Sequence, residues 1–224
     1  IVNSAYFGVR RKVTTAVQAV SYLGLENLSS MVLAANIFSQ LEAKTVLAGF
    51  SIEALWEHSN AVGHLARRIM KEENRPKQEF DEALTAGLLH DCGKLVLAAN
   101  TPKEYRDVLL RAQDEGRPLF DVERERLGAS HAEIGAYLLG TWGLPDPIVE
   151  AVAFHHEPVK GQSFGLTYLT VVHVANALAN AAAAGVPKDE WPSAVDERHL
   201  ETSGLAGKLP RWCDLLDERE ARAE

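Results

Sequence analysis

The chain has 224 residues, of which 46% are hydrophobic and 24% are charged, with a formal net charge of -8. This composition is close to that of an ordinary globular protein and excludes a fibrous or an intrinsically disordered chain. A surface that neutralises nucleic-acid phosphates needs a basic face, so the acidic balance argues against nucleic acid as a partner. The length suits one large domain or two small lobes around a hydrophobic core.

The sequence shows no signal for export or membrane insertion. It opens on Ile1 without a basic segment followed by an apolar one, and its two cysteines are Cys92 and Cys213. The longest apolar-looking stretch, 166–185, is interrupted by polar residues, which predicts a core helix rather than a membrane span. We therefore expect a cytoplasmic protein with reduced thiols and no membrane partner. The opening on Ile1 also indicates a piece of a longer chain.

Helix signals recur along the whole sequence. Apolar residues return at spacings of three and four, and no period-two alternation is sustained, which predicts an all-α fold. Residues 14–50 are predicted to hold two or three helices broken at Gly24. A further helix is expected from about Ser51 to just before Asn74, because Asn74, Arg75 and Pro76 interrupt the apolar stripe there.

Breakers and caps place the later helices. One helix is predicted at about 80–99, and another runs from Pro102 to Glu115, closed by glycine and proline. Ser130 and Glu133 have the spacing of a capping box, so they predict a helix that ends near Trp142.

The next helix is expected to open at Asp146 and Pro147, with proline at its first helical position. We predict one domain over residues 1–224, in which 1–50 form an N-terminal helical lobe. Residues 51–185 form its core, and residues 186–224 form a C-terminal helical extension.

Polar residues with metal-ligand chemistry fall on apolar faces of these predicted helices. His58 shares a face with Leu55 and Val62, and Asp91 lies in line with Leu88 and Leu95. The spacing of their neighbours also turns the following imidazoles inward: His131, His155 and His156. Buried groups of this kind need hydrogen bonds or a cation, and imidazole with carboxylate suits iron, manganese, zinc or nickel.

Simpler interpretations remain open for each of these residues. A single inward histidine such as His58 is often a hydrogen-bonded core residue. Asp91 could cap a helix end or pair with Lys94, and His131 could belong only to a capping turn. We interpret three further histidines as surface or core residues, namely His64, His173 and His199. Cys92 is interpreted as a packing residue.

Together, these residues carry a family resemblance. The segment 88–94, Leu-Leu-His-Asp-Cys-Gly-Lys, resembles the signature of the HD phosphohydrolase superfamily. Further matching words are spread over nearly the whole chain, at 2–8, 23–25, 55–59, 125–135, 142–145 and 155–158. With them the chain is similar to the HDOD family, the HD-related output domains.

The resemblance implies roles for individual residues. His58, His90 and Asp91 would be the leading metal ligands, and Lys94 would face a phosphate. His131, His155 and His156 match the additional histidines of two-metal relatives such as the HD-GYP phosphodiesterases. The family's last ligand is an aspartate, which Asn176 replaces here. An amide oxygen is a weaker donor than a carboxylate, so the resemblance argues against a full dinuclear centre. The Gly-Tyr-Pro word is absent after His156, which argues against cyclic-di-GMP hydrolysis.

The resemblance implies a regulatory output domain without robust catalysis, which would pass a signal from an upstream receiver or sensor domain to a protein partner. The alternative is a metal-dependent phosphohydrolase that acts on a nucleotide or cyclic dinucleotide, with Asp91 and Lys94 as its catalytic residues. A third hypothesis is binding of a nucleotide without turnover, with phosphate contacts from Lys94, Arg67 or Arg68.

Overall fold

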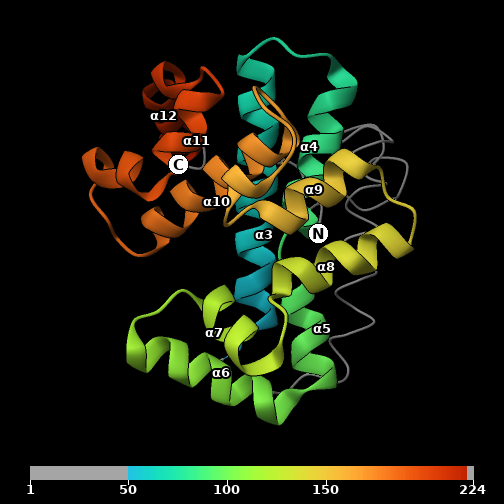
Figure 1. Ribbon diagram of the computed structural model, residues 1–224. Coiled ribbons are helices and arrows are strands. Elements are labelled where there is room, and N and C mark those ends of the chain that lie inside the picture. The colour runs from blue at the N-terminus through green and yellow to red at the C-terminus, as the bar shows by residue number, and fades with distance from the viewer. Residues whose placement is uncertain (1–49, 221–224) are drawn as a thin grey trace, which may run out of the picture.

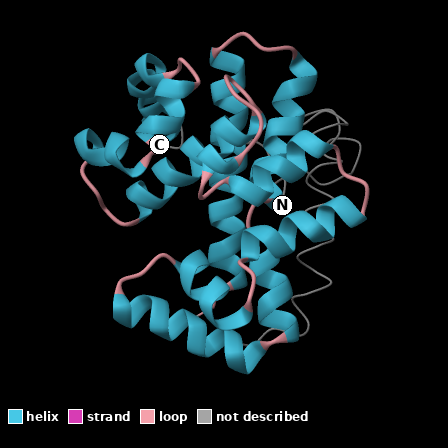
Figure 2. Ribbon diagram, in the orientation of Figure 1, coloured by secondary structure: helices cyan, strands magenta, loops and turns pink. Residues whose placement is uncertain are grey.

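The computed structural model describes residues 50–220, and it confirms the all-α prediction for this part of the chain, which contains no strand (Figure 2). The elements are α3 (Ile52–Glu72), α4 (Lys77–Leu89), α5 (Cys92–Asn100), α6 (Pro102–Glu115), α7 (Leu119–Leu127), α8 (His131–Thr141), α9 (Asp146–Phe154), η2 (Pro158–Lys160), α10 (Tyr168–Ala183), η3 (Lys188–Ala194), α11 (Glu197–Thr202), η4 (Ala206–Lys208) and α12 (Leu209–Glu220). None of these helices is both long and apolar enough to cross a lipid bilayer. The predicted helices of residues 14–50 lie outside the described residues.

Helix α3 runs through the middle of the molecule (Figure 1), where it packs against α4, α10 and α12. Helices α8 and α9 lie beside each other, with α5 packed on α8 and both α4 and α10 packed on α9. Helices α6 and α7 form a hairpin at the lower end of the view. The polar residues of interest therefore come from segments far apart in sequence that meet around α3.

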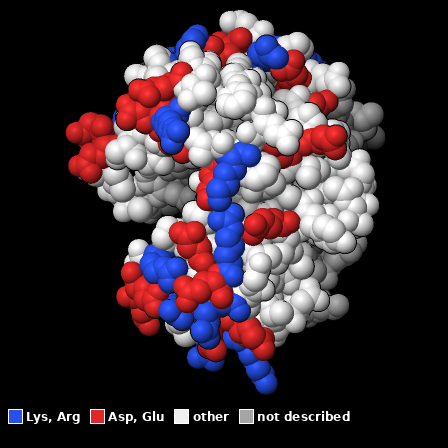
Figure 3. Space-filling view, in the orientation of Figure 1, with Lys and Arg blue, Asp and Glu red and all other residues white. Residues whose placement is uncertain are grey.

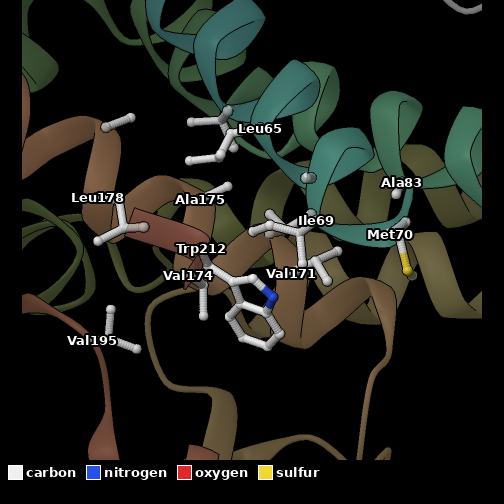
Figure 4. Packing of buried hydrophobic residues seen from close by; sticks show 14 of the residues in the cluster. Leu65, Ile69, Met70, Ala83, Val171, Val174, Ala175, Leu178, Val195 and Trp212 are labelled. Atoms are coloured by element: carbon white, nitrogen blue, oxygen red, sulfur yellow. The ribbon is translucent and has the colours of Figure 1, made fainter. Parts of the chain in front are cut away.

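The largest hydrophobic cluster joins α3 and α10 to the C-terminal helices (Figure 4). Trp212 of α12 is fully buried there against a layer that includes Ile69 and Val171. Its indole nitrogen donates a hydrogen bond to Glu73 at 3.1 Å, so the polar edge of the ring is satisfied where its body is buried.

Two smaller clusters support the region around residue 90. One lies between α3, α4, α5, α8 and α9 and includes Leu88, Leu95 and Leu139. Cys92 is buried in the same cluster, as predicted for a packing residue. The other lies between α5, α6 and α7 and includes Tyr105 and Val122.

The sequence prediction of one helix over 80–99 is wrong, because the chain forms two helices there. Helix α4 ends at Leu89, and Asp91 leaves helical geometry with φ -103° and ψ 9° before α5 begins at Cys92. The periodic apolar pattern continues across the break, so it could not reveal it. Tertiary packing decides the break, since α4 packs on α3 while α5 turns away to pack on α8.

Glycines allow these close approaches. A Cβ atom on Gly87 of α4 would lie 2.5 Å from the Cα atom of Gly63 in α3. A Cβ atom on Gly93 of α5 would overlap the carbonyl oxygen of His131 at the start of α8. The Gly93 contact holds the α4–α5 turn directly against the first turn of α8.

The predicted helix starts at Ser51 and Ser130 are confirmed. The side chain of Ser51 accepts a hydrogen bond from the backbone nitrogen of Ala54 at 3.1 Å. Ser130 and Glu133 form the complete capping box, in which the Glu133 carboxylate accepts from the Ser130 backbone nitrogen at 2.7 Å. This cap fixes the position of the next residue, His131.

We predict that Gly93→Ala destabilises the domain by about 1–3 kcal/mol, because the added methyl group forces α5 away from α8. Gly140→Ala is the matched control, since its Cβ atom would meet only a Val149 methyl group at 3.8 Å. That variant should be neutral, or stabilised by up to about 1 kcal/mol through its better helix propensity. Urea unfolding of both variants measures the difference, and equal stabilities would contradict the proposed packing role.

Candidate metal centre

The residues that the resemblance implied as ligands meet in one site, where five histidines lie around the buried carboxylate of Asp91 and Asn176 borders them. They come from five parts of the fold: His58 from α3, His90 and Asp91 from the α4–α5 turn, His131 from the first turn of α8, His155 and His156 from the end of α9, and Asn176 from α10. Asp91 is 1% exposed.

The two oxygen atoms of Asp91 face two different groups of imidazoles. The His131 side comprises His131, His155 and His156, and the Oδ1 atom of Asp91 lies 3.1 Å from Nε2 of His131 and 3.6 Å from Nε2 of His155. The His58 side comprises His58 and His90, whose Nε2 atoms lie 3.6 and 3.3 Å from Oδ2. One carboxylate thus borders two potential cation positions.

Three of the imidazole rings are oriented by a hydrogen bond at Nδ1. His90 contacts the carbonyl oxygen of Gly87 at 2.7 Å, and His155 contacts that of Val152 at 2.8 Å. His131 contacts the carboxylate of Glu123 at 2.6 Å. These acceptors require Nδ1 to carry the proton, so a neutral ring presents its Nε2 lone pair to Asp91. This arrangement is common for histidines that bind metals.

The Nε2 atoms also face one another at short distance. His58 and His90 are separated by 3.2 Å at Nε2, and His131 and His156 by 3.0 Å. Neither Oδ1 of Asp91 nor Nε2 of His155 has a hydrogen bond of acceptable geometry among the described residues. Converging lone pairs next to an unsatisfied buried carboxylate oxygen fit a divalent metal with nitrogen and oxygen ligands.

The alternative pairing of Asp91 with Lys94 is also present. Lys94 Nζ lies 2.6 Å from Oδ2 of Asp91, so this contact concerns the His58 side alone. Asn176 borders that side too, with its Oδ1 atom 3.0 Å from Nε2 of His58 and 2.9 Å from the amide nitrogen of Asn180. The His58 side therefore contains a lysine cation and a neutral amide, whereas on the His131 side the carboxylate oxygen faces only imidazoles and has no hydrogen bond of acceptable geometry among the described residues.

Sequence reasoning missed Glu123, a second buried carboxylate at the site. Glu123 is 0% exposed and accepts hydrogen bonds from the His131 backbone nitrogen at 2.7 Å and the Tyr105 hydroxyl at 3.1 Å, in addition to His131 Nδ1. It belongs to a charged run, 123–126, in which its neighbours are partly or fully exposed. That run looks like a solvated helix face, so only the position of α7 reveals the role of Glu123.

Other polar residues lie outside the two groups. His173 contacts the carbonyl oxygen of His155 at 2.7 Å, and His199 contacts the Thr170 hydroxyl at 2.9 Å. Both are buried, so of the surface and core positions that the sequence left open, the structure gives them core positions. Arg67 pairs with Asp81 at 3.3 Å. A pocket of about 550 Å³ opens beside His155, His156 and Asn176, and its lining contains no lysine or arginine.

Opposing effects determine the charges at the site. Burial alone would raise the pKa of Asp91, but His90, Lys94, His131 and His155 outweigh burial and hold this pKa well below its ordinary value. Burial, reinforced by His90, lowers the pKa of His58 to about 4, and burial lowers that of His155 to about 3.

His131 behaves differently from these two histidines. Burial and Lys94 would lower its pKa, but the carboxylates of Asp91 and Glu123 on its two sides raise it above the ordinary value. The two flanking carboxylates therefore favour the protonated form of His131. A metal on the His131 side has to displace that proton.

The fold and the site define an all-helical domain of the HD type, with histidines from several helices gathered around the aspartate of a His-Asp pair. The chain belongs to the HDOD domain family, whose model matches residues 1–158.

Relatives share parts of the chain. An uncharacterized protein of Treponema pallidum (strain Nichols) is 29% identical over 163 residues, which are 70% of this chain and 29% of that protein. A ribonuclease Y of Thermus thermophilus is 33% identical over 127 residues, which are 56% of this chain and 16% of that enzyme. The aligned regions thus span less than a third of the length of these relatives.

Solved structures share the fold over almost the whole chain. A candidate phosphohydrolase of Shewanella amazonensis SB2B has a TM-score of 0.73 at 23% identity, covering 97% of this chain and 77% of that one. The MmoQ response regulator of Methylococcus capsulatus str. Bath has a TM-score of 0.55 at 25% identity, covering 94% of this chain and 79% of that one.

We predict that the metal-free domain loses stability as the pH falls from about 6.5 to about 4.5. His58 and His155 are neutral in the folded state at these pH values but take up protons when the chain unfolds, so the unfolded state binds more protons and stability rises with pH. The loss should be on the order of 1–4 kcal/mol, since one pKa unit corresponds to about 1.4 kcal/mol. The lowered pKa of Asp91 adds its own loss mainly below this pH range, where the carboxylate of the unfolded chain takes up protons.

His131 acts in the opposite direction above pH 6.5, because its raised pKa stabilises the folded state until the pH exceeds that value. Urea unfolding in EDTA at a series of pH values measures the profile, and His155→Gln should flatten its acid limb. A stability that is independent of pH between 4.5 and 6.5 would contradict neutral buried imidazoles.

Proposed function

We propose that the chain is a regulatory HDOD domain that binds one divalent metal ion on the His131 side of Asp91 and lacks robust catalysis. The observation that carries this proposal is the convergence of three imidazoles on the Oδ1 atom of Asp91, which no lysine or arginine reaches among the described residues. His131 and His155 are each oriented by a hydrogen bond at Nδ1, which supports a ligand role over a purely structural one. Iron, manganese, zinc and nickel all accept such donors.

The His58 side is proposed to bind metal weakly. Lys94 is ion-paired with Oδ2 of Asp91 at 2.6 Å, so a second cation there would have to approach a lysine ammonium group. Asn176 supplies only a neutral amide oxygen where the family has a carboxylate. A centre with a single metal lacks the paired ions that stabilise both the attacking and the leaving oxygen in two-metal phosphoryl chemistry.

The regulatory role rests on the family and on a relative. The chain belongs to the HDOD family, and it shares its fold with the MmoQ response regulator at 25% identity. We infer that the domain receives a signal from an upstream receiver or sensor domain and contacts a protein partner through its helical surface. The metal would then stabilise the arrangement of α8 and α9 around Asp91.

Elemental analysis of the purified chain should find about one divalent metal per molecule. His156→Ala removes a ligand on the His131 side and should weaken metal binding at least about 10-fold. His58→Ala is the matched control, because it removes an imidazole from the other side and should leave occupancy nearly unchanged. Equal losses in the two variants would contradict the proposed position, and a metal-free wild-type protein would contradict metal binding itself.

A second candidate function is metal-dependent phosphohydrolysis. It is favoured by the position of Lys94, whose side chain is 20% exposed at the site, and by the pocket of about 550 Å³ beside His155 and His156. A bound divalent metal would supply a Lewis acid that polarises a phosphoryl oxygen. Lys94 would bind a phosphate oxygen, and the same contact could hold a nucleotide without turnover.

Hydrolysis of bis-para-nitrophenyl phosphate distinguishes the two candidates. We expect the wild-type protein to show no turnover above free metal, and Asn176→Asp to raise the metal content toward two ions per chain because it restores a carboxylate. Wild-type turnover that is lost in Lys94→Ala, at unchanged metal content, would instead establish the enzyme. Turnover that appears only in Asn176→Asp would show that the asparagine at position 176 is enough to silence the site.

A further inference from the structure

Helix α7 contacts the ligand segments of the His131 side with one of its faces. Phe120, Glu123 and Arg124 stand at positions i, i+3 and i+4, so they lie on the same side of the helix. Each of them contacts a different part of the segments that carry His131, His155 and His156. Leu119 and Val122 of α7 belong to the hydrophobic cluster with α5 and α6.

Glu123 contacts His131 twice. Its Oε2 atom accepts hydrogen bonds from the backbone nitrogen at 2.7 Å and from Nδ1 at 2.6 Å. Its Oε1 atom accepts from the hydroxyl of Tyr105 in α6 at 3.1 Å. The carboxylate is 0% exposed, so it joins α6 and α7 directly to the proposed ligand in a region of low dielectric constant.

Phe120 and Arg124 contact the end of α9. The ring of Phe120 stacks on His156 with a centroid separation of 4.6 Å and an interplanar angle of 13°. Arg124 pairs with Glu157 at 2.5 Å and with Glu133 of α8 at 3.2 Å. One helix therefore determines the position of His131 and His156, which lie only 3.0 Å apart at Nε2.

The α6–α7 hairpin has its own small hydrophobic cluster with α5. Its outer face carries ion pairs of Arg111 and Arg117 with Glu115 and Glu125. Figure 3 shows acidic and basic side chains intermixed at the lower end of the molecule, where Figure 1 places α6 and α7. Ile134 of α8 packs against the same cluster, and the hydrogen bonds and stacking at the proposed metal centre are further links between this hairpin and the segments of α8 and α9.

We propose that Glu123 is a positioning residue for His131, and that metal binding on the His131 side is coupled through α7 to the order of the α6–α7 hairpin. This inference rests on the proposed metal binding. The metal restrains His131 and His156, which restrains Glu123 and Phe120 in turn. Because coupling free energies are reciprocal, a partner that displaces the hairpin would weaken metal binding by the same factor.

Hydrogen–deuterium exchange of the full chain, with and without Mn²⁺, tests this coupling together with the Mn²⁺ affinity from calorimetry. In the wild-type protein, Mn²⁺ should slow amide exchange in α6 and α7. Glu123→Gln should weaken Mn²⁺ binding about 10- to 100-fold and reduce the slowing, because a neutral amide oxygen is a weaker acceptor than a carboxylate and leaves His131 a less basic ligand. Glu125→Gln is the matched control on the same helix, since its carboxylate pairs with Arg111 and Arg117.

Phe120→Leu provides a second variant that keeps Glu123 but removes the ring stacked on His156. It should weaken both Mn²⁺ binding and the slowing of amide exchange in α6 and α7. If Glu123→Gln fails to fold in EDTA, Phe120→Leu tests the coupling in its place. Two results would overturn the coupling alone. One is an Mn²⁺ affinity in these variants equal to that of Glu125→Gln, and the other is amide exchange in α6 and α7 of the wild-type protein that does not change when Mn²⁺ is added. A wild-type protein that binds no Mn²⁺ would overturn both the coupling and the proposed metal site.

Discussion

The burial of the Asp91 carboxylate is the constraint on which the rest of the site depends. An ionised group that is 1% exposed needs compensation from cations or hydrogen bonds. The fold supplies it from α3, the α4–α5 turn, α8 and α9, and only Oδ2 has a lysine partner, at 2.6 Å. The Oδ1 atom faces only imidazoles, and this explains why a metal ion is the proposed compensation on that side.

The packing around Asp91 serves this arrangement. The break between α4 and α5 removes Asp91 from a helical ladder, and Gly93 lets the turn lie against the His131 carbonyl oxygen. The capping box of Ser130 and Glu133 starts α8 at His131 and so fixes the position of this residue beside Asp91. Glu123 then fixes the ring of His131 from behind, so the ligand geometry depends on α7 as well as on the helices that carry the ligands.

Local sequence signals predicted much of this structure. Period-3.6 apolar spacing and caps such as Ser130 predicted the helices, because these features act within one turn of the chain, and inward spacing selected His58 and His131. The break at Asp91 was not predictable, since it arises from packing between distant helices. Glu123 was hidden in a charged run, and no pattern in one sequence shows which charge of such a run is buried.

The family membership and the asymmetry of the site point to the same account, in which a metal on one side of Asp91 supports a regulatory helical domain. Anomalous X-ray diffraction from crystals grown with Mn²⁺ tests this claim most directly. The account predicts one strong anomalous peak within bonding distance of Oδ1 of Asp91 and of Nε2 of His131, His155 and His156. A single peak beside His58 and His90, or no peak within reach of Asp91, would contradict it.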